Sequence, residues 1–242
     1  MSFSQLSLAA AYLGSTYGTY IALSPPNPRP ADAPPTTDQK GQPIRDSMHM
    51  WKFTHNHFAK FMIIPFALLS SHAASLAYKY PNLPPALLGH GAQNLNKDLI
   101  TWSPSTAIPL ALLFFVGVPL RLIPYRHLGK NFTFALTKPS GLRTTGIYAY
   151  MQHPSYTAVV VLVLCNIALL ARLDGVLGCW IRPDMVKTLT GVEIAGLAIG
   201  GCLFLTGVGT RVVEEEAMLK EEFKEDWVRW HAKTARFIPW VI

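Results

Sequence analysis

The chain has 242 residues, of which half are apolar and only 14% are charged, whereas soluble domains usually carry about a quarter charged residues. Together with a positive mean hydropathy, this composition argues against a soluble domain and favours a membrane protein. The net charge of +7 does not indicate nucleic-acid binding, because the basic residues are not clustered beside aromatic residues on one amphipathic element.

Five apolar segments approach the length of about 20 residues that a transmembrane helix needs. They are residues 4–24, 60–80, 105–125, 155–174 and 189–211. The first contains several Ser, Thr and Tyr residues and lacks a basic stretch before it, so it is not read as a cleaved signal peptide. The sequence predicts an all-α integral membrane protein with about five transmembrane helices.

The first third of the chain differs in composition from the rest. The proline-rich stretch 24–43 reads as an extended linker, because proline interrupts helices and central strands. The segment after it is interpreted as an interfacial helix with Trp51 and Phe53 at headgroup level. We therefore divide the chain into residues 1–58, holding span, linker and interfacial segment, and residues 59–242, holding the core and a cytosolic tail.

Histidine and cysteine residues raise the question of a metal site. His49, His55 and His57 have no acidic or cysteine partners at ligand spacing, so they are interpreted as solvated and no metal is expected. The three cysteines, Cys165, Cys179 and Cys202, form no C-x-x-C pair, and Cys165 and Cys202, inside apolar runs, are read as packing residues.

Basic residues set the expected orientation, because Lys and Arg favour cytosolic loops. With five spans and a cytosolic tail, the cytosolic loops receive most of them, including Arg121, Arg126 and the six from Arg211 to Arg236. The opposite loops hold fewer, among them Lys97 and Arg182. This places two polar clusters, 138–158 and 210–242, on one face. Spans four and five would form a hairpin, so the clusters should meet.

The second cluster follows the last span. Arg211 and Glu215 are four residues apart and share one helix face. The carboxylates of residues 214–216 stand near the bilayer edge, where acids are functional candidates, although a solvated helix turn explains them equally well. Leu219, Phe223, Trp227 and Trp230 recur at helical spacing, which is more often a packing stripe than a ligand site.

The first cluster contains a His-Pro step. Pro154 suits the first turn of a helix, and His153 before it is able to donate or accept a hydrogen bond. Gly141 and Gly146 supply backbone that a ligand can approach closely. A lone His-Pro step at a helix entrance is usually structural. These residues alone predict a polar pocket at the cytosolic end of a helical hairpin, and no specific reaction.

Two motifs resemble those of the isoprenylcysteine carboxyl methyltransferase family, which is related to phospholipid methyltransferases. "GIYAYMQHPSYTA" is similar to its G-x-Y-x-x-x-R-H-P-x-Y-x-G signature, and "EEEAMLKEEFKEDWVRW" followed by "RFIP" is similar to its tail. "YRHLGKNFTFAL" also resembles the segment before the signature. The resemblance covers residues 105–242.

The resemblance implies an enzyme of the endoplasmic-reticulum membrane with several spans. Such a protein-S-isoprenylcysteine O-methyltransferase uses S-adenosylmethionine to methylate the carboxylate of a prenylated C-terminal cysteine, and its partners are CaaX-processed proteins and the lipid bilayer. Its cofactor pocket would be cytosolic and formed by the C-terminal half. Arg211 would meet the substrate carboxylate and, with Gln152, form the catalytic pair. The implied cofactor contacts are Ser140, Gly141, Leu142, Arg143, Tyr148, His153, Pro154, Ser155, Tyr156 and Glu215.

The sequence departs from the family pattern at several positions. Gln152 stands where the family has Arg, which removes a cation that Arg143 is expected to restore. Ser140 replaces a His, Ala158 a Gly, and Lys224 the Gly after Phe223. Two alternatives therefore stay open: a methyltransferase acting on a lipid amine or another small acceptor, and a membrane homologue without turnover.

Overall fold

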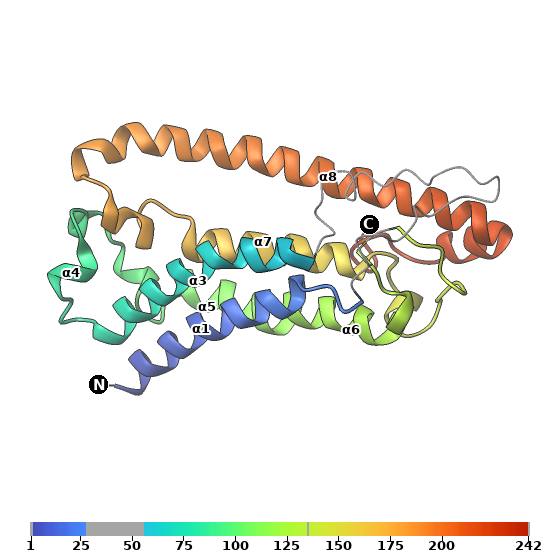
Figure 1. Ribbon diagram of the computed structural model, residues 1–242, viewed down its shortest axis with the longest axis horizontal. Coiled ribbons are helices and arrows are strands. Elements are labelled where there is room, and N and C mark those ends of the chain that lie inside the picture. The colour runs from blue at the N-terminus through green and yellow to red at the C-terminus, as the bar shows by residue number, and fades with distance from the viewer. Residues whose placement is uncertain (1, 28–55, 135, 242) are drawn as a thin grey trace. The chain divides into compact units, whose positions relative to one another are not determined.

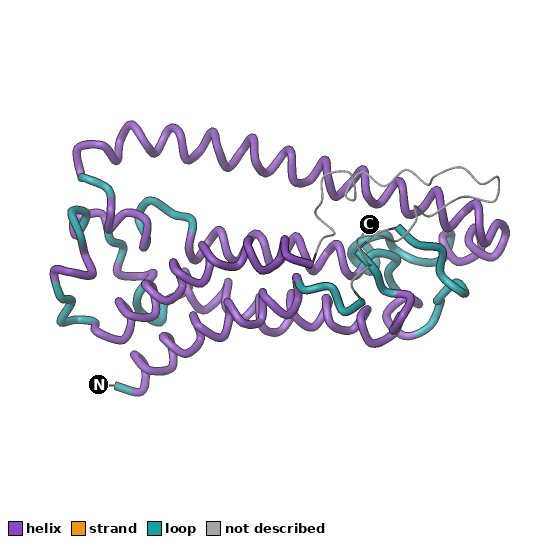
Figure 2. The backbone as a smooth tube through the Cα atoms, viewed as in Figure 1, coloured by secondary structure: helices purple, strands orange, loops and turns teal. Residues whose placement is uncertain are grey.

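The computed structural model describes residues 2–27, 56–134 and 136–241. In this part of the chain the secondary structure is helical, with one isolated bridge between Met151 and Ala235 and no strand (Figure 2). The predicted all-α class is confirmed. The expected linker, the interfacial Trp51 and Phe53, and His49 and His55 lie outside the described residues, so the predicted division at residue 58 stays a prediction.

The chain forms two compact units, each assembled from three stretches. The first unit comprises Met1–Ile21, Phe61–Val118 and Val160–Cys202, and the second comprises Ala22–Lys60, Pro119–Val159 and Leu203–Ile242. Two long helices, α7 (Pro154–Leu170) and α8 (Pro183–His231), contribute residues to both units (Figure 1).

The first unit packs around the buried side chains of α1 (Phe3–Leu23) and α3 (Asn56–Lys79). Tyr12 is fully buried, and its hydroxyl donates a 2.6 Å hydrogen bond to the carbonyl of Leu99, which satisfies the polar atom inside an apolar core. The first unit also contains six short helical elements: α4 (Pro85–Leu88), η1 (Ala92–Asn94), η2 (Lys97–Leu99), α5 (Pro104–Leu112), η3 (Leu113–Gly117) and η6 (Val176–Trp180).

The second unit holds both polar clusters. It contains α6 (Val118–Leu128), the turns η4 (Gly129–Asn131) and η5 (Gly146–Ala149), the first residues of α7 and the second half of α8. As predicted from the His-Pro step, α7 begins at Pro154, since proline lacks the N–H that the first helical turn leaves unpaired.

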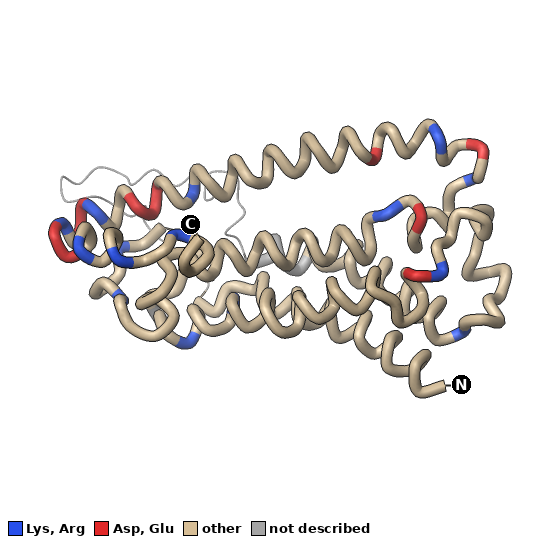
Figure 3. The backbone as a smooth tube through the Cα atoms, turned by 180° about the vertical axis from the view of Figure 1, so that it is seen from behind, with Lys and Arg blue, Asp and Glu red and all other residues tan. Residues whose placement is uncertain are grey.

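Within the described part of the chain, two helical runs are long and apolar enough to cross a membrane: Lys97–Leu128 and Pro183–His231. They contain the predicted spans 105–125 and 189–211, and α7 is a shorter apolar helix of 17 residues. In Figure 3 the charged residues of α8 gather toward its two ends. The spans expected at 4–24, 60–80 and 155–174 stay predictions.

The predicted stripe on α8 is a packing surface. Trp227 and Trp230 are buried against Tyr148, with Leu219 and Phe223 packed around them. The helix departs from helical geometry at Lys224, whose φ is 46°. This bend turns the last residues of α8 and so sets the direction in which the following segment leaves the helix.

Candidate active site

The two polar clusters meet through backbone hydrogen bonds within the second unit. The amides of Gln152 and His153 donate to the carbonyls of Ala235 and Arg236 at 2.8 and 2.9 Å, and the amide of Ala235 donates to the carbonyl of Tyr150 at 3.2 Å. The segment before α7 therefore runs beside the segment after α8. This pairing confirms that the two clusters come together, and it brings their side chains within reach of each other.

His153 is buried and is held by an acidic residue of α8. Its Nε2 lies 3.1 Å from Oε1 of Glu216, and the other carboxylate oxygen of Glu216 accepts from Nη2 of Arg236 at 2.8 Å. Because an ionised carboxylate only accepts hydrogen bonds, Nε2 of His153 carries the proton in this contact. His153, Glu216 and Arg236 thus form a connected group, which we call the histidine group.

Tyr156, one turn into α7, connects two further residues of α8. Its hydroxyl donates to Oε2 of Glu215 at 2.7 Å and accepts from Nε of Arg211 at 3.3 Å. Arg211 is buried, and its Nη2 donates to the carbonyl of Phe134 at 2.6 Å. Arg211 and Glu215 therefore lie on one face of α8, as their spacing predicts, and Tyr156 bridges them.

The side chain of Gln152 is occupied by the segment after α8. Its Nε2 donates to the carbonyl and hydroxyl of Thr234 at 2.8 and 3.0 Å and to the carbonyl of His231 at 3.2 Å. Its Oε1 lies 2.8 Å from Nδ1 of His231. Both the nitrogen and the oxygen of the Gln152 amide are therefore engaged. The side chain fastens the segment before α7 to the segment after α8.

Tyr148 is buried in the aromatic cluster with Trp227 and Trp230. Trp230 donates from Nε1 to the Tyr148 carbonyl at 2.7 Å. Burial raises the pKa of Tyr148, and the nearby charge of Glu215 raises it further, so the phenol is a neutral hydrogen-bonding group at ordinary pH.

Residues 140 to 143, which are expected to contact the cofactor, take no part in the hydrogen bonds of the histidine group or of Tyr156. Ser140 is exposed and accepts from Asn131, Leu142 packs on the aromatic cluster, and Arg143 is exposed. Among the described residues, no hydrogen bond or ion pair links this stretch to His153, Tyr156 or Glu215. Arg143, expected to restore the missing cation, is thus on the surface.

Two features of the structure require glycine at position 146: its backbone conformation and the nearby imidazole of His127. The φ of Gly146 is +64°, and a Cβ there would lie 2.9 Å from Nε2 of His127. A side chain at this position would be strained by its backbone conformation and would collide with the imidazole. The close approach expected at Gly146 is therefore made to His127, whereas Gly141 faces open space.

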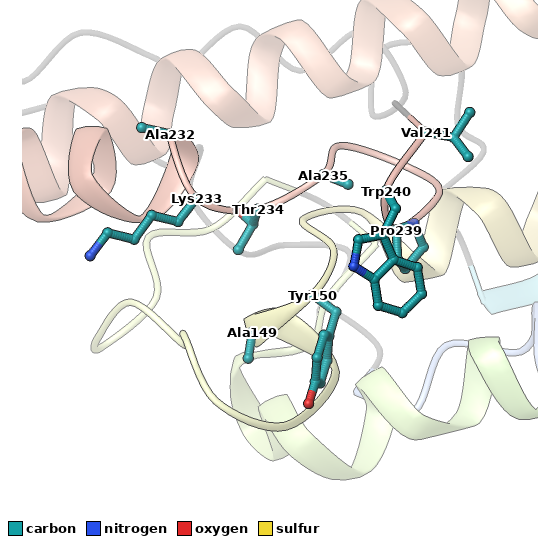
Figure 4. Close-up of a pocket in the computed structure, with 9 residues that line it drawn as sticks. All are labelled: Ala149, Tyr150, Ala232, Lys233, Thr234, Ala235, Pro239, Trp240 and Val241. Atoms are coloured by element: carbon teal, nitrogen blue, oxygen red, sulfur yellow. The ribbon is translucent and has the colours of Figure 1, made fainter.

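A hollow of about 390 Å³ lies next to these groups, and Thr234 and Ala235, which bond to Gln152, belong to its lining. It is lined by residues 149–150, 232–235 and 239–241, and in Figure 4 the rings of Tyr150 and Trp240 lie near each other, tilted by 56°, while Lys233 points away. The two ring centroids are 6.5 Å apart. None of the predicted site residues lines it, so the hollow is distinct from the predicted site.

The sequence did not single out Glu216 or Arg236. Residues 214–216 are consecutive acids, and helical spacing from Arg211 indicates Glu215 as the residue on the same face. His153 could have indicated that one of these acids is its partner, because a buried imidazole needs a hydrogen-bond partner. The sequence does not say which of the three acids faces it. Arg236 stands in the "RFIP" stretch and is positioned by the backbone bond to His153.

The family comparison supports the resemblance found from the motifs. Residues 110–181 match the model of the isoprenylcysteine carboxyl methyltransferase (ICMT) family. No curated protein and no solved structure matches the chain. The match confirms the predicted family resemblance over these residues and indicates a membrane-bound methyltransferase of the isoprenylcysteine type. It includes α7 and the His-Pro step and ends before Arg211.

Proposed function

We propose that this chain is an S-adenosylmethionine-dependent protein-S-isoprenylcysteine O-methyltransferase of the endoplasmic-reticulum membrane. Its acceptor is the C-terminal carboxylate of a prenylated cysteine. The observation that carries the proposal is the arrangement Arg211–Tyr156–Glu215, in which a buried cation and an acid share one hydroxyl. Tyr156, which supplies this hydroxyl, belongs to the segment that matches the family.

The residues present fit a polar cofactor. Nδ1 of His153 is buried and has no hydrogen-bond partner among the described residues, and leaving such an atom unpaired costs about 1–3 kcal/mol. Because Nε2 faces Glu216, Nδ1 is the ring nitrogen left for a ligand, and in the tautomer with the proton on Nε2 it is an acceptor. A ligand that donates a hydrogen bond to it would remove this cost.

S-adenosylmethionine supplies the methyl group to be transferred. Glu215 would hold one of its donors, Tyr148, Ser155 and Tyr156 would surround it, and His153 would accept a hydrogen bond through Nδ1. Gln152 enters the proposal as a positioning residue, because it fastens the segment that ends at Arg236. Ser140, Gly141, Leu142, Arg143 and Pro154 remain proposed cofactor contacts from the resemblance.

Arg211 would orient the acceptor. A C-terminal carboxylate has a reference pKa of about 3.5 and is ionised at pH 7, so the reaction needs no strong general base. The requirement is to align the carboxylate oxygen and to exclude water. A buried guanidinium meets a carboxylate by charge-assisted hydrogen bonds, and it offers nothing comparable to a neutral amine. This favours the carboxylate acceptor over a lipid amine.

The test is methyl transfer by membranes that contain the full chain, supplied with labelled S-adenosylmethionine and either a farnesylcysteine analogue or phosphatidylethanolamine. Methyl ester formation on the first is expected. Methylation of the second would support the amine-acceptor enzyme, and no transfer to either would support a homologue without turnover.

Two variants test the assigned roles within this proposal. Glu215→Ala should abolish cofactor binding, and unchanged binding would remove Glu215 from the site. Arg211→Ala should weaken binding of the acidic acceptor more than binding of the cofactor. An equal loss of both would contradict the role given to Arg211.

A further inference from the structure

The segment after α8 runs along the first turn of α7. Its bridge at Ala235 is parallel, the amide of His153 donates to the carbonyl of Arg236 at 2.9 Å, and Oγ1 of Thr157 donates to the carbonyl of Phe237 at 3.0 Å. All of these residues belong to the second unit. From Ala235 onward the segment therefore advances in the same direction as α7.

This course takes the segment from the polar beginning of α7 toward its apolar part. Thr157 stands directly before the apolar run 158–165 of that helix. Beyond Phe237 the side chains are apolar and exposed: Trp240 is 91% exposed, Val241 is 76% exposed, and Ile238 is exposed as well. A cluster of exposed apolar side chains marks an interaction surface, because its contact with water is unfavourable.

Tyr150, which precedes α7, completes this surface. It is exposed, and its ring centroid lies 6.5 Å from that of Trp240. Both rings border the hollow of about 390 Å³ (Figure 4). The described residues that line this hollow include Lys233 and Thr234 and no acid. We call the exposed apolar and aromatic residues of this surface the C-terminal patch: Tyr150, Ile238, Trp240 and Val241.

The chemistry of the C-terminal patch matches the boundary between lipid headgroups and acyl chains. Trp and Tyr are enriched at this boundary, because their rings carry one polar atom on an apolar body. A basic side chain beside them, such as Lys233, meets anionic headgroups. The course of the segment beside the apolar run of α7, in a chain that matches a membrane-bound family, favours lipid over a second protein as the occupant.

We propose that the C-terminal patch is a membrane-contact surface, on which residues 237–241 lie at the headgroup level of a phospholipid bilayer. This contact goes beyond the proposed reaction and does not depend on the acceptor or the cofactor. The same segment supplies the carbonyls that accept from the amides of Gln152 and His153. Contact with the bilayer therefore also holds this edge of the candidate site at the membrane surface.

The test is the depth of a spin label in the full chain, reconstituted in nanodiscs of phosphatidylcholine and phosphatidylserine. Cys202→Ser removes the exposed cysteine, whereas Cys165 and Cys179 are buried, and a nitroxide is attached to Val241→Cys. Oxygen concentrates in the bilayer and a nickel chelate stays in water, so the ratio of their collision rates with the label reports depth. This ratio should be several times higher at position 241 than at Glu225→Cys, which is an exposed position of α8.

Leu203→Cys is the positive control, because Leu203 is exposed on the apolar part of α8, and its label should give a high ratio. Trp240→Asp, combined with the label at position 241, should lower the ratio to that at position 225, since a charge is costly in the apolar layer. Trp240→Phe is the matched control, because it keeps an apolar ring and should leave the ratio unchanged. The Trp240 side chain is exposed, so neither change disturbs the core.

A ratio at position 241 as low as that at position 225 would place the C-terminal patch in water and overturn the inference. Low collision rates with both reagents would show that protein covers the patch, such as a second copy of the chain, and would overturn it as well. An unchanged ratio in Trp240→Asp would show that the indole does not hold the segment at the membrane.

Failure of the contact and failure of the proposed function are distinguishable. If the label at Leu203 is also in water, α8 does not cross the bilayer and the contact surface fails with its premise. A high ratio at position 241 in a protein that transfers no methyl group would contradict the proposed function and leave the membrane contact in place.

Discussion

Glu216 holds His153 through one carboxylate oxygen and Arg236 through the other, at 3.1 and 2.8 Å. His153 stands directly before α7, Glu216 lies in the second half of α8, and Arg236 belongs to the segment that follows α8. The acid is buried, at 8% exposure, and it joins three parts of the chain. It thereby positions His153, which is proposed to contact the cofactor.

Removing this acid should destabilise the protein more than removing an ordinary acid. Glu216→Ala leaves both nitrogens of a buried imidazole without a described partner, and we expect a loss of about 2 kcal/mol in the free energy of unfolding. Thermal denaturation in detergent measures the change. Glu221→Ala is the control, since Glu221 is exposed on the same helix. Equal melting temperatures for the two variants would contradict the structural role of Glu216.

Lys224 lies where the chain bends with a positive φ of 46° and ψ of −114°. Glycine adopts such a conformation without steric cost, whereas a residue with a Cβ is strained there. Lys224→Gly should therefore stabilise the protein, by about 1 kcal/mol. Lys220→Gly, in regular helix on an exposed position, should destabilise it by a similar amount. A lower melting temperature for Lys224→Gly would show that the bend does not strain Lys224.

The sequence predicted the parts of this region that depend on local pattern. The His-Pro step gave the first residue of α7, the helical spacing of Arg211 and Glu215 gave their common face, and the aromatic stripe gave the packing surface of α8. All three follow from backbone geometry over a few residues.

The remaining parts depend on contacts between distant segments. The choice of Glu216 for His153 follows from how α8 lies against α7, and Arg121 reaches Ala22, about a hundred residues away in the chain. No spacing rule gives such a pair. Gln152 was read as a catalytic candidate because of its place in a motif, whereas its bonding partners, His231 and Thr234, are set by the pairing of two loops.

Restoring the family's arginine at position 152 should therefore harm the fold. Gln152→Arg loses the acceptor facing His231, and the amide donors to Thr234 are not reproduced in the same positions. We expect a loss of about 1–3 kcal/mol in stability, measured by thermal denaturation. Arg143→Gln, at an exposed site, controls for a change of one charge. A Gln152→Arg variant as stable as the unaltered chain would refute the fastening role.

Tyr156→Phe tests the hydroxyl that connects Arg211 and Glu215. The ring remains to pack against His153, with 5.6 Å between the ring centroids, so the variant removes the donor to Glu215 and the acceptor for Arg211 and little else. A hydrogen bond to a charged group contributes about 1.5–3 kcal/mol, so the affinity for S-adenosylhomocysteine, measured by calorimetry, should fall about 10- to 150-fold. Tyr150→Phe is the control, because Tyr150 is exposed and outside this arrangement.

If the hydroxyl acts by holding Glu215, its loss should matter only while that acid is present. The double variant Tyr156→Phe/Glu215→Gln should then bind S-adenosylhomocysteine no more weakly than Glu215→Gln alone, because residues in one hydrogen-bond network are not additive. Additive losses would mean that Tyr156 and Glu215 act separately on the ligand.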